Sequence, residues 1–233
     1  MSISVLQSAI VEEKLQGIYR RLYAHFGPQH WWPGDTPFEV IVGAILTQNT
    51  SWKNVEKAMT NLKQAGLLHP QGLRRVRIAR LARLIRPSGY YNLKAKKLAA
   101  FIRFLFGVHH GRLAHLFAQE TGALREELLA VYGIGPETAD SIILYAGEKP
   151  VFVVDAYTRR IMARLGLASE DATYEELQRL FMDHLPRDSA LYNEYHALFV
   201  ALGKDICLKR TPRCAVCPLL EICPRGSSSP LAA

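Results

Sequence analysis

The amino-acid sequence predicts an all-α protein. Apolar residues recur at helical spacing along most of the chain. Within residues 8–26, for example, Val11, Leu15 and Ile18 fall on one stripe. The connections between such segments are short and rich in glycine and proline, as in "HWWPGDTP" and "YGIGP". The only convincing extended stretch, Val151–Val154, has no partner strand in the sequence, so we interpret it as a buried connector.

The expected helices follow from this periodicity. Pro37 suits the first position of a buried helix, "PFEVIVGAILTQ". The segment "LRRVRIARLARLIR", residues 73–86, has six arginines and no acid, and we interpret it as a helix with a solvated basic face. Residues 226–233 are expected to form a loose tail. The expected helices span residues 8–26, 37–48, 52–66, 73–85, 92–106, 124–132, 137–147, 156–166, 173–185 and 189–204.

Composition and charge restrict the class of protein. The chain has 233 residues, 49% hydrophobic and 21% charged, which is typical of a globular protein with one large or two small domains. It has no apolar run of the roughly 20 residues that span a bilayer. Its N-terminus lacks a signal-peptide pattern, so we expect a cytoplasmic protein. The net charge of +8 favours a polyanionic partner such as nucleic acid, although many basic proteins bind none.

Four cysteines are clustered near the C-terminus, and they are the only cysteines in the chain. Such clustering is atypical of disulfide staples and favours metal binding in a reducing compartment. Four sulfur ligands suit either zinc or an iron–sulfur cluster, and the spacing C-x6-C-x2-C-x5-C leaves both open. The four residues are Cys207, Cys214, Cys217 and Cys223.

A glycine turn opens a helix in "VYGIGPETAD". We place Gly135 at the N-cap and Pro136 at the first helical position. Gly133 and Gly135 let the backbone approach a ligand closely, and the N–H groups at the helix start suit an anion such as a DNA phosphate. The alternative for "GIG", including Ile134, is a plain connection between two helices.

A single aspartate, Asp155, follows the apolar run "VFVV" and precedes "AYTRRIMARLG". Aspartate is among the best N-cap residues, so a purely structural role is one interpretation. The alternative is a carboxylate held partly out of water beside a reacting centre.

Taken together, "YGIGPETAD", "VFVVDAYTRR" and "CLKRTPRCAVCPLLEIC" resemble the endonuclease III superfamily, the helix-hairpin-helix DNA glycosylases with an iron–sulfur cluster. The stretches "ILTQNTSWKNVEKA" and "RPSGYYNLKAKKLAAFI" are also similar to segments of this family. The resemblance covers roughly residues 8 to 225. It implies that Asp155 is the catalytic carboxylate, that the four cysteines hold a [4Fe–4S] cluster, and that damaged double-stranded DNA is the partner.

One position departs from the endonuclease III pattern. Bifunctional members of the family carry a lysine just before the Thr-Ala pair of the hairpin, and its amine forms a Schiff base with the sugar. Glu137 occupies that position here. A carboxylate cannot form a Schiff base, so we expect a monofunctional glycosylase that leaves the strand intact. Glu137 is also a favourable acid at a helix N-terminus.

All three tryptophans lie between residues 31 and 52. They could anchor the N-terminal helix in the core, or they could stack against an extruded base. The pairing of "WWP" with the hairpin glutamate is similar to the 3-methyladenine DNA glycosylase branch, whose alkylated purines carry a positive charge that aromatic faces attract. By this resemblance the base-pocket candidates are Trp31, Trp32, Pro33, Trp52, Glu137 and Lys204. Some members of that branch lack the cysteines that are present here.

Two further residues are candidates for DNA contact. Gln48, in "LTQNT", matches the family residue that enters the duplex near the flipped nucleotide, although it also suits the polar end of a helix. Lys94, in "GYYNLKAKK", is the candidate for a phosphate contact, together with the backbone of Gly133, Ile134 and Gly135.

The resemblance implies a two-lobed helix-hairpin-helix glycosylase fold with a C-terminal [4Fe–4S] cluster loop. We expect a six-helix barrel at residues 30–149 and a cluster lobe made of residues 1–29 and 150–225. The expected protein is a monomer near the nucleoid that excises alkylated purines such as 3-methyladenine from DNA. The alternatives are an endonuclease III-like glycosylase for oxidised pyrimidine, uracil or a mismatched base, with or without lyase activity, and a DNA-binding protein without catalysis.

Overall fold

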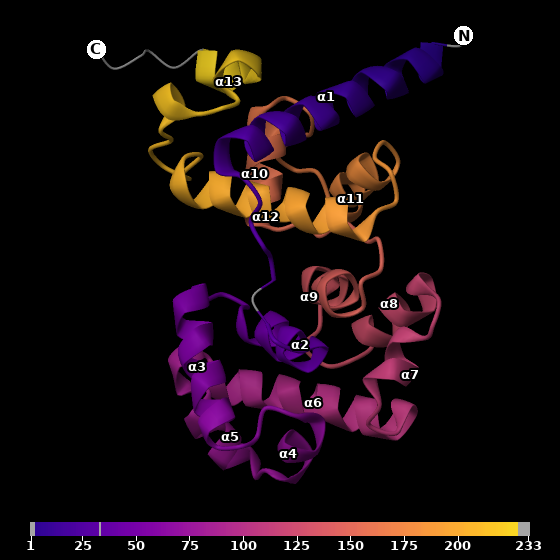
Figure 1. The fold of residues 1–233 in the computed structure, drawn as a ribbon, viewed down its shortest axis with the longest axis vertical. Helices are drawn as coiled ribbons and strands as arrows, with labels where there is room; N and C mark the ends of the chain where they lie inside the picture. Colours follow the sequence, from indigo (N-terminus) through magenta and orange to yellow (C-terminus); the bar gives the residue numbers. More distant parts are fainter. Residues whose placement is uncertain (1–2, 33, 228–233) are drawn as a thin grey trace. The chain divides into compact units, whose positions relative to one another are not determined.

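The structure, a computed structural model, describes residues 3–32 and 34–227, with side chains for residues 8–32 and 34–226. Within these ranges all regular secondary structure is helical and no strand occurs, which confirms the predicted fold class (Figure 1). The chain divides into two compact units. The hairpin unit spans Trp32–Lys149, and the cysteine unit combines the chain up to Trp31 with the chain from Pro150 onward. Along the described part of the chain, no helix has the length and apolar character needed to cross a membrane.

The hairpin unit is built around helix α2 (Pro37–Leu46). Thr36 caps this helix by accepting a hydrogen bond from the N–H of Glu39, and Pro37 occupies the first helical position as predicted. Most side chains of α2 are buried, because α3, α6, α9 and η2 pack around it. The other elements are α3 (Trp52–Gln64), α4 (Pro70–Arg75), α5 (Ile78–Leu84), α6 (Tyr91–His109), α7 (Leu113–Phe117), α8 (Thr121–Leu129), α9 (Pro136–Ser141), the 3-10 turn η1 (Arg86–Ser88) and the π-helical turn η2 (Ile142–Ala146).

The arginine-rich segment forms two helices, and the prediction of one helix at 73–85 is wrong. Helix α4 begins earlier, at Pro70, where the imidazole of His69 accepts the N–H of Gly72. Val76 and Arg77 then adopt extended backbone, with ψ of 137° and 136°. Valine loses side-chain freedom in a helix, and this favours a break at that point.

Helices α8 and α9 form the helix–hairpin–helix. Gly133 lies between them with φ of +83°, a conformation that glycine adopts without strain. Across the hairpin, Arg125 of α8 grips the fully buried carboxylate of Asp140 on α9 through two hydrogen bonds of 2.7 and 3.1 Å. This bidentate, charge-assisted pair fixes the two helices against each other.

The cysteine unit is built around helix α12 (Ser189–Asp205), which packs against α1 (Ile3–Phe26) and α10 (Ala156–Arg164). Its core is aromatic: Phe152 and Phe181 stack with ring centroids 3.9 Å apart, and Tyr195 packs edge-on against both. The remaining elements are α11 (Tyr174–Met182), the 3-10 turns η3 (Cys214–Val216) and η4 (Leu220–Ile222), and α13 (Pro224–Ser227).

The stretch Val151–Val154 is a buried connector, as predicted, with each residue at most 3% exposed. A buried extended chain needs partners for its backbone polar groups. Helix α11 supplies them: Gln178 donates to the carbonyl of Phe152 at 2.7 Å, and the Tyr174 hydroxyl accepts the N–H of Val154 at 3.4 Å. Side chains of a helix therefore replace a neighbouring strand and fix the point at which the connector reaches Asp155.

Candidate active site

Asp155 is the N-cap of α10, where the buried connector ends. Its Oδ1 accepts hydrogen bonds from the backbone N–H of Thr158 at 2.7 Å and from the Thr158 hydroxyl at 3.0 Å. Its Oδ2 makes neither bond and faces Nε2 of His196 at 3.6 Å. The carboxylate side chain is 14% exposed. Oδ1 of Asp155 therefore caps helix α10, whereas Oδ2 takes no part in the cap and faces His196.

The electrostatic environment of Asp155 favours the ionised form. Burial raises the pKa of this carboxyl, but the neighbouring His196 and the two Thr158 donors outweigh burial and hold the pKa below its ordinary value. A carboxylate at a helix N-terminus is further favoured by the helix dipole. The site therefore holds a poorly hydrated anion at neutral pH.

His196 comes from the middle of α12 and is only 5% exposed. The sequence does not indicate this role, because a lone histidine in the apolar stretch "YHALFV" carries no spacing signal toward Asp155. The two residues meet only because α10 and α12 pack together.

Two other candidates of the same unit are Trp31, which is half-buried, and Lys204, which is exposed.

Three aromatic side chains gather in the hairpin unit. The Trp32 ring lies 5.1 Å, centroid to centroid, from both Trp52 and Tyr145. A Cβ on Gly43 would lie 3.2 Å from Trp32 and 3.4 Å from Trp52, so the glycine lets both indoles approach helix α2. Trp32 and Trp52 are half-buried, and Tyr145 is 8% exposed. Pro33, the remaining predicted pocket residue of "WWP", lies outside the described residues.

The hairpin presents backbone at its surface. Gly135 is the N-cap of α9, Pro136 is the first helical residue, and a Cβ on Gly135 would meet nothing within 4 Å. Among the described residues, neither Gly133 nor Gly135 uses its N–H in a hydrogen bond to protein. Ile134 is buried and anchors the turn, whereas Glu137 is exposed in the first turn of α9.

Gln48 ties the loop after α2 to the hairpin. Its side-chain amide donates to the carbonyl of Gly133 at 3.1 Å and to the Thr138 hydroxyl at 2.8 Å. Its carbonyl accepts a hydrogen bond from Lys97, whose stem lies against Gly133. The amide is therefore engaged with the protein, and the next residue, Asn49, is exposed with φ of +54°.

Lys94 does not fit its predicted contact with DNA phosphate. The side chain is 2% exposed, and its ammonium donates to the carbonyls of Leu46 at 2.8 Å and Ser88 at 2.6 Å. It thereby satisfies the C-terminus of α2 from inside the unit. Burial, with a smaller contribution from repulsion by Lys97, lowers the pKa of Lys94 to about 8. The lysine-rich pattern gave no sign of this, because helical position alone does not distinguish an inward lysine from an outward one.

The four cysteines line a single cavity in the cysteine unit, together with Arg164 of α10. Arg164 donates to Sγ of Cys207 at 3.1 Å and to the carbonyl of Leu208 at 2.8 Å. Donation from a guanidinium to sulfur stabilises a thiolate, so the surroundings suit a thiolate-bound group. In the part of the chain that the structure describes, no group of three or more His, Cys, Asp or Glu side chains has the geometry of a site for one metal ion.

A model of the HhH-GPD superfamily of base excision DNA repair proteins matches residues 42–187, which is more than half of the chain and includes both the hairpin and Asp155. The chain belongs to the HhH-GPD superfamily. This confirms the family resemblance read from the sequence motifs.

Individual members of the superfamily resemble the chain over most of its length. A Methanocaldococcus jannaschii protein, provisionally named a DNA repair glycosylase, is 47% identical over 91% of this chain and 96% of its own. Endonuclease III of Thermotoga maritima is 32% identical over 80% of this chain and 82% of its own.

Two solved structures are also similar to the chain. The H. pylori 3-methyladenine DNA glycosylase bound to 1,N6-ethenoadenine is 31% identical, with a TM-score of 0.70 over 84% of this chain and 97% of its own. An endonuclease III trapped covalently on DNA shares the fold, with 23% identity and a TM-score of 0.81 over 93% of this chain and 97% of its own.

The lowered pKa of Lys94 predicts a specific pH dependence of stability. The folded state releases the proton near pH 8, whereas the unfolded chain holds it to its ordinary value of 10.5. Between these values the unfolded state binds more protons, so the free energy of unfolding rises with pH, by up to about 3 kcal/mol. Urea unfolding from pH 7 to 10.5 should show wild type gaining stability relative to Lys94→Met.

The matched control is Lys96→Met, which changes an exposed lysine on the same helix. Its stability difference from wild type should stay constant across this pH range. A constant difference for Lys94→Met as well would show that Lys94 keeps an ordinary pKa in the folded protein.

Proposed function

We propose that this chain is a monofunctional DNA glycosylase of base excision repair, which hydrolyses the N-glycosidic bond of alkylated purines such as 3-methyladenine and leaves the strand intact. The observation that carries the proposal is a poorly hydrated carboxylate, Asp155, in a chain whose hairpin helix "PETADS" contains no amine. The likeness to the H. pylori 3-methyladenine glycosylase supports the choice of substrate.

Asp155 is the catalytic carboxylate in this proposal. As the bond between C1′ and the base nitrogen breaks, positive charge develops on the sugar, and a nearby anion lowers the energy of that charge. Oδ1 is fixed by the two donors of Thr158, which leaves Oδ2 as the oxygen that faces the sugar or its attacking water. Water then adds to C1′, its proton is released, and the base leaves as a neutral purine.

His196 acts as a positioning residue. Its buried imidazole lies 3.6 Å from Oδ2 and contributes to the low pKa of Asp155, so the carboxylate remains charged without full hydration. A charge that is already oriented when the substrate arrives needs no reorganisation during the reaction.

The aromatic group of Trp32, Trp52 and Tyr145 receives the extruded base in this proposal. An alkylated purine nucleotide is cationic, and an aromatic face attracts a cation by up to about 2 kcal/mol when both are desolvated. Stacking also offsets part of the cost of taking the base out of the duplex. The same cation has a weak glycosidic bond, so excision requires no acid to protonate the leaving base. Trp31, Glu137 and Lys204 remain proposed contributors to base recognition.

The hairpin holds the DNA backbone. The N–H groups of Gly133 and Gly135 are available to a phosphate, and such contacts grip DNA without reading its sequence. Gln48 holds the hairpin in place by donating to the carbonyl of Gly133. The neighbouring Asn49 is exposed, so its side-chain amide is accessible to DNA. We therefore assign the duplex-facing role to the Gln48–Asn49 pair.

The four cysteines hold a [4Fe–4S] cluster in this proposal. They line one cavity, and the donation from Arg164 to Cys207 suits a thiolate ligand. When bound, the cluster supplies structural order and no hydrolytic chemistry. The ligand loop then presents the exposed residues Lys209 and Arg210 toward phosphates.

The direct test is base release from duplexes that each carry one lesion. The proposal predicts release of free 3-methyladenine from methylated DNA, with the strands intact. Asp155→Asn should bind the same duplex within a fewfold of wild type and lose at least about 100-fold in single-turnover release, since electrostatic groups of this kind contribute about that much. Asp188→Asn, which changes the N-cap of α12, is the matched control and should release normally.

Two outcomes would contradict this assignment. Release only from uracil, mismatched or oxidised bases would replace the substrate and keep the glycosylase. Normal turnover by Asp155→Asn would remove Asp155 from the mechanism.

The contact with His196 predicts a shift in the pH profile. Because His196 helps to lower the pKa of Asp155, His196→Asn should raise that pKa and move the acidic limb of single-turnover base release to higher pH. At pH 8 the variant should approach the wild-type rate, because Asp155 is ionised in both proteins. A rate loss that is equal at every pH from 4 to 8 would indicate a structural role only.

A further inference from the structure

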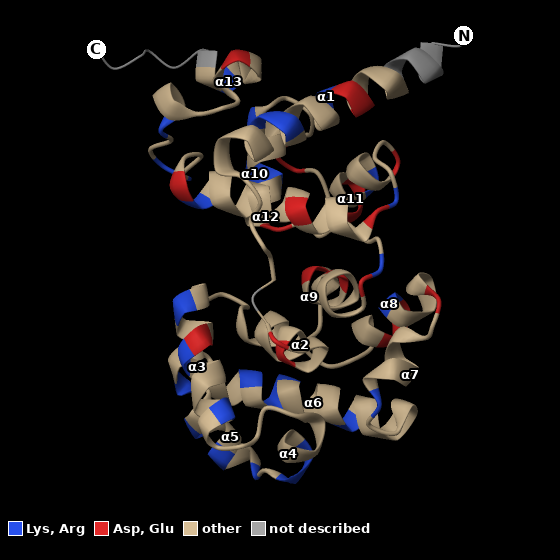
Figure 2. Ribbon diagram, viewed as in Figure 1, with Lys and Arg blue, Asp and Glu red and all other residues tan. Residues whose placement is uncertain are grey.

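The net positive charge of this protein comes from one part of the chain. Residues 57–119 contain 13 Lys and Arg and no Asp or Glu. The other residues carry 16 Lys and Arg against 21 Asp and Glu, so the excess of +8 comes entirely from this stretch. The stretch forms α4, α5 and α6 and most of α3, and the basic residues of the hairpin unit gather on these helices (Figure 2).

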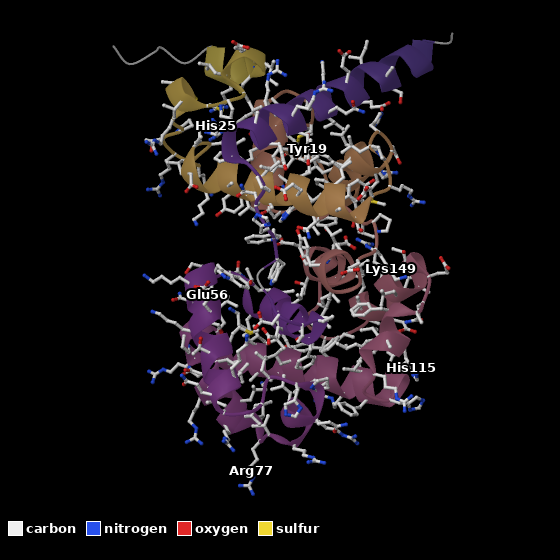
Figure 3. All side chains as sticks on the ribbon, in the orientation of Figure 1. Tyr19, His25, Glu56, Arg77, His115 and Lys149 are labelled. Atoms are coloured by element: carbon white, nitrogen blue, oxygen red, sulfur yellow. The ribbon has the colours of Figure 1, made fainter. Side chains whose placement is uncertain are left out.

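Four arginines of this stretch surround one hollow on the surface. Arg75, Arg77, Arg80 and Arg83 line it together with His69, and its volume is about 630 Å³. All four side chains are exposed, and Arg77 projects from the ribbon into solvent (Figure 3). Among the described residues, none of these guanidinium groups makes a hydrogen bond or an ion pair with the protein. Four like charges at close range destabilise the folded state, so the cluster suggests an external anion.

The arginine hollow and the hairpin lie on opposite sides of α6. Lys97 of α6 lies against Gly133 of the hairpin, whereas the Phe106 ring of α6 carries the guanidinium of Arg74 at 4.3 Å. Lys97 and Phe106 are nine residues apart, which is about two and a half helical turns, so their side chains leave opposite faces of α6. Figure 1 shows α4 and α5 on the side of α6 away from α2 and α9. DNA held at the hairpin therefore does not reach the hollow without a sharp bend, which is energetically unfavourable.

We propose that the hollow lined by Arg75, Arg77, Arg80 and Arg83 is a second DNA site, which binds the phosphates of another duplex segment while the hairpin holds the first. Arg77, Arg80 and Arg83 recur every third residue along one side of α5. They span about 9 Å of helix axis, over which one DNA strand presents two to three phosphates. Arginine binds phosphate through its planar fork of donors, which favours it over lysine in such a row.

An extended polyanion fits this surface better than a compact ligand does. The charges form a row along α5, and the hollow is open to solvent, as shown by the exposure of all four arginines. The hollow offers no carboxylate or buried polar side chain that would select one small molecule. The proposal relies on the DNA binding of the superfamily and not on the lesion assigned above.

The test measures retention of a second duplex. A biotinylated duplex with an uncleavable abasic-site analogue is fixed to beads and saturated with full-length protein, and a fluorescent undamaged duplex is added. Wild type should retain the fluorescent duplex. Arg77→Gln/Arg80→Gln/Arg83→Gln should retain it at least about tenfold less. The slope of log retention against log salt concentration should fall by about 2 to 3, because each phosphate contact contributes about 0.9.

Matched variants separate a local site from general attraction. Lys14→Gln/Arg20→Gln/Arg187→Gln removes three exposed charges from the cysteine unit and should retain the second duplex as wild type does. Arg77→Lys/Arg80→Lys/Arg83→Lys keeps the charge and should retain most of it. Glutamine and lysine have helix preferences close to that of arginine, so α5 should persist in both variants.

Three outcomes would overturn the proposal: equal retention by the arginine and control triples, no second duplex held by wild type, or displacement of that duplex by stoichiometric tripolyphosphate. The last result would identify a site for a small polyanion. Base release from the methylated duplex, measured in parallel, should be unchanged in the arginine triple. Absence of base release in wild type would count against the proposed function alone, since retention is measured without catalysis.

Discussion

The partly buried carboxylate of Asp155 is the group on which the proposed chemistry depends. A carboxylate in poor contact with water normally gains a proton, and here Thr158 and His196 prevent it. Each of these two residues is fixed within the cysteine unit: Thr158 by the first turn of α10, and His196 by the aromatic core that holds α12. The buried connector, held by α11, determines where the carboxylate stands. The charge proposed to act on the sugar is therefore a product of core packing.

The basic residues of the hairpin unit have two separate roles. Lys94 and Lys97 work inside the unit, where one satisfies the end of α2 and the other holds Gln48 against the hairpin. Lysine suits this task, because its single ammonium group reaches carbonyl oxygens through a flexible stem. The arginines of α4 and α5 remain outside and largely unpaired. A hairpin with a fixed backbone and a separate basic surface gives the unit two ways to hold a polyanion.

The sequence predicted the fold well and the site only in part. Helical periodicity and the motifs around Gly133 and Asp155 were sufficient for the all-α class, the hairpin and the family. The break at Val76 and Arg77 interrupts an apolar periodicity that continues on both sides of it, and the start of α4 depends on the ring orientation of His69, so the sequence pattern predicts neither. Lys94 points inward, contrary to the phosphate contact predicted for it. His196 and Tyr145 carry no signal in the sequence, because both reach their partners through tertiary packing. Spacing along one chain predicts which residues share a helix face, and it does not predict which helices meet.

The central claim is that a carboxylate works here without an amine nucleophile. Borohydride trapping tests it most directly, because the reagent reduces a Schiff base to a permanent link between enzyme and DNA. The reaction is run on a methylated duplex while base release is in progress. Excision by Asp155 without an amine nucleophile should give released base and no trapped complex. A lesion-dependent covalent complex would contradict it, and its loss in Lys97→Ala would identify the lysine beside Gly133 as the nucleophile.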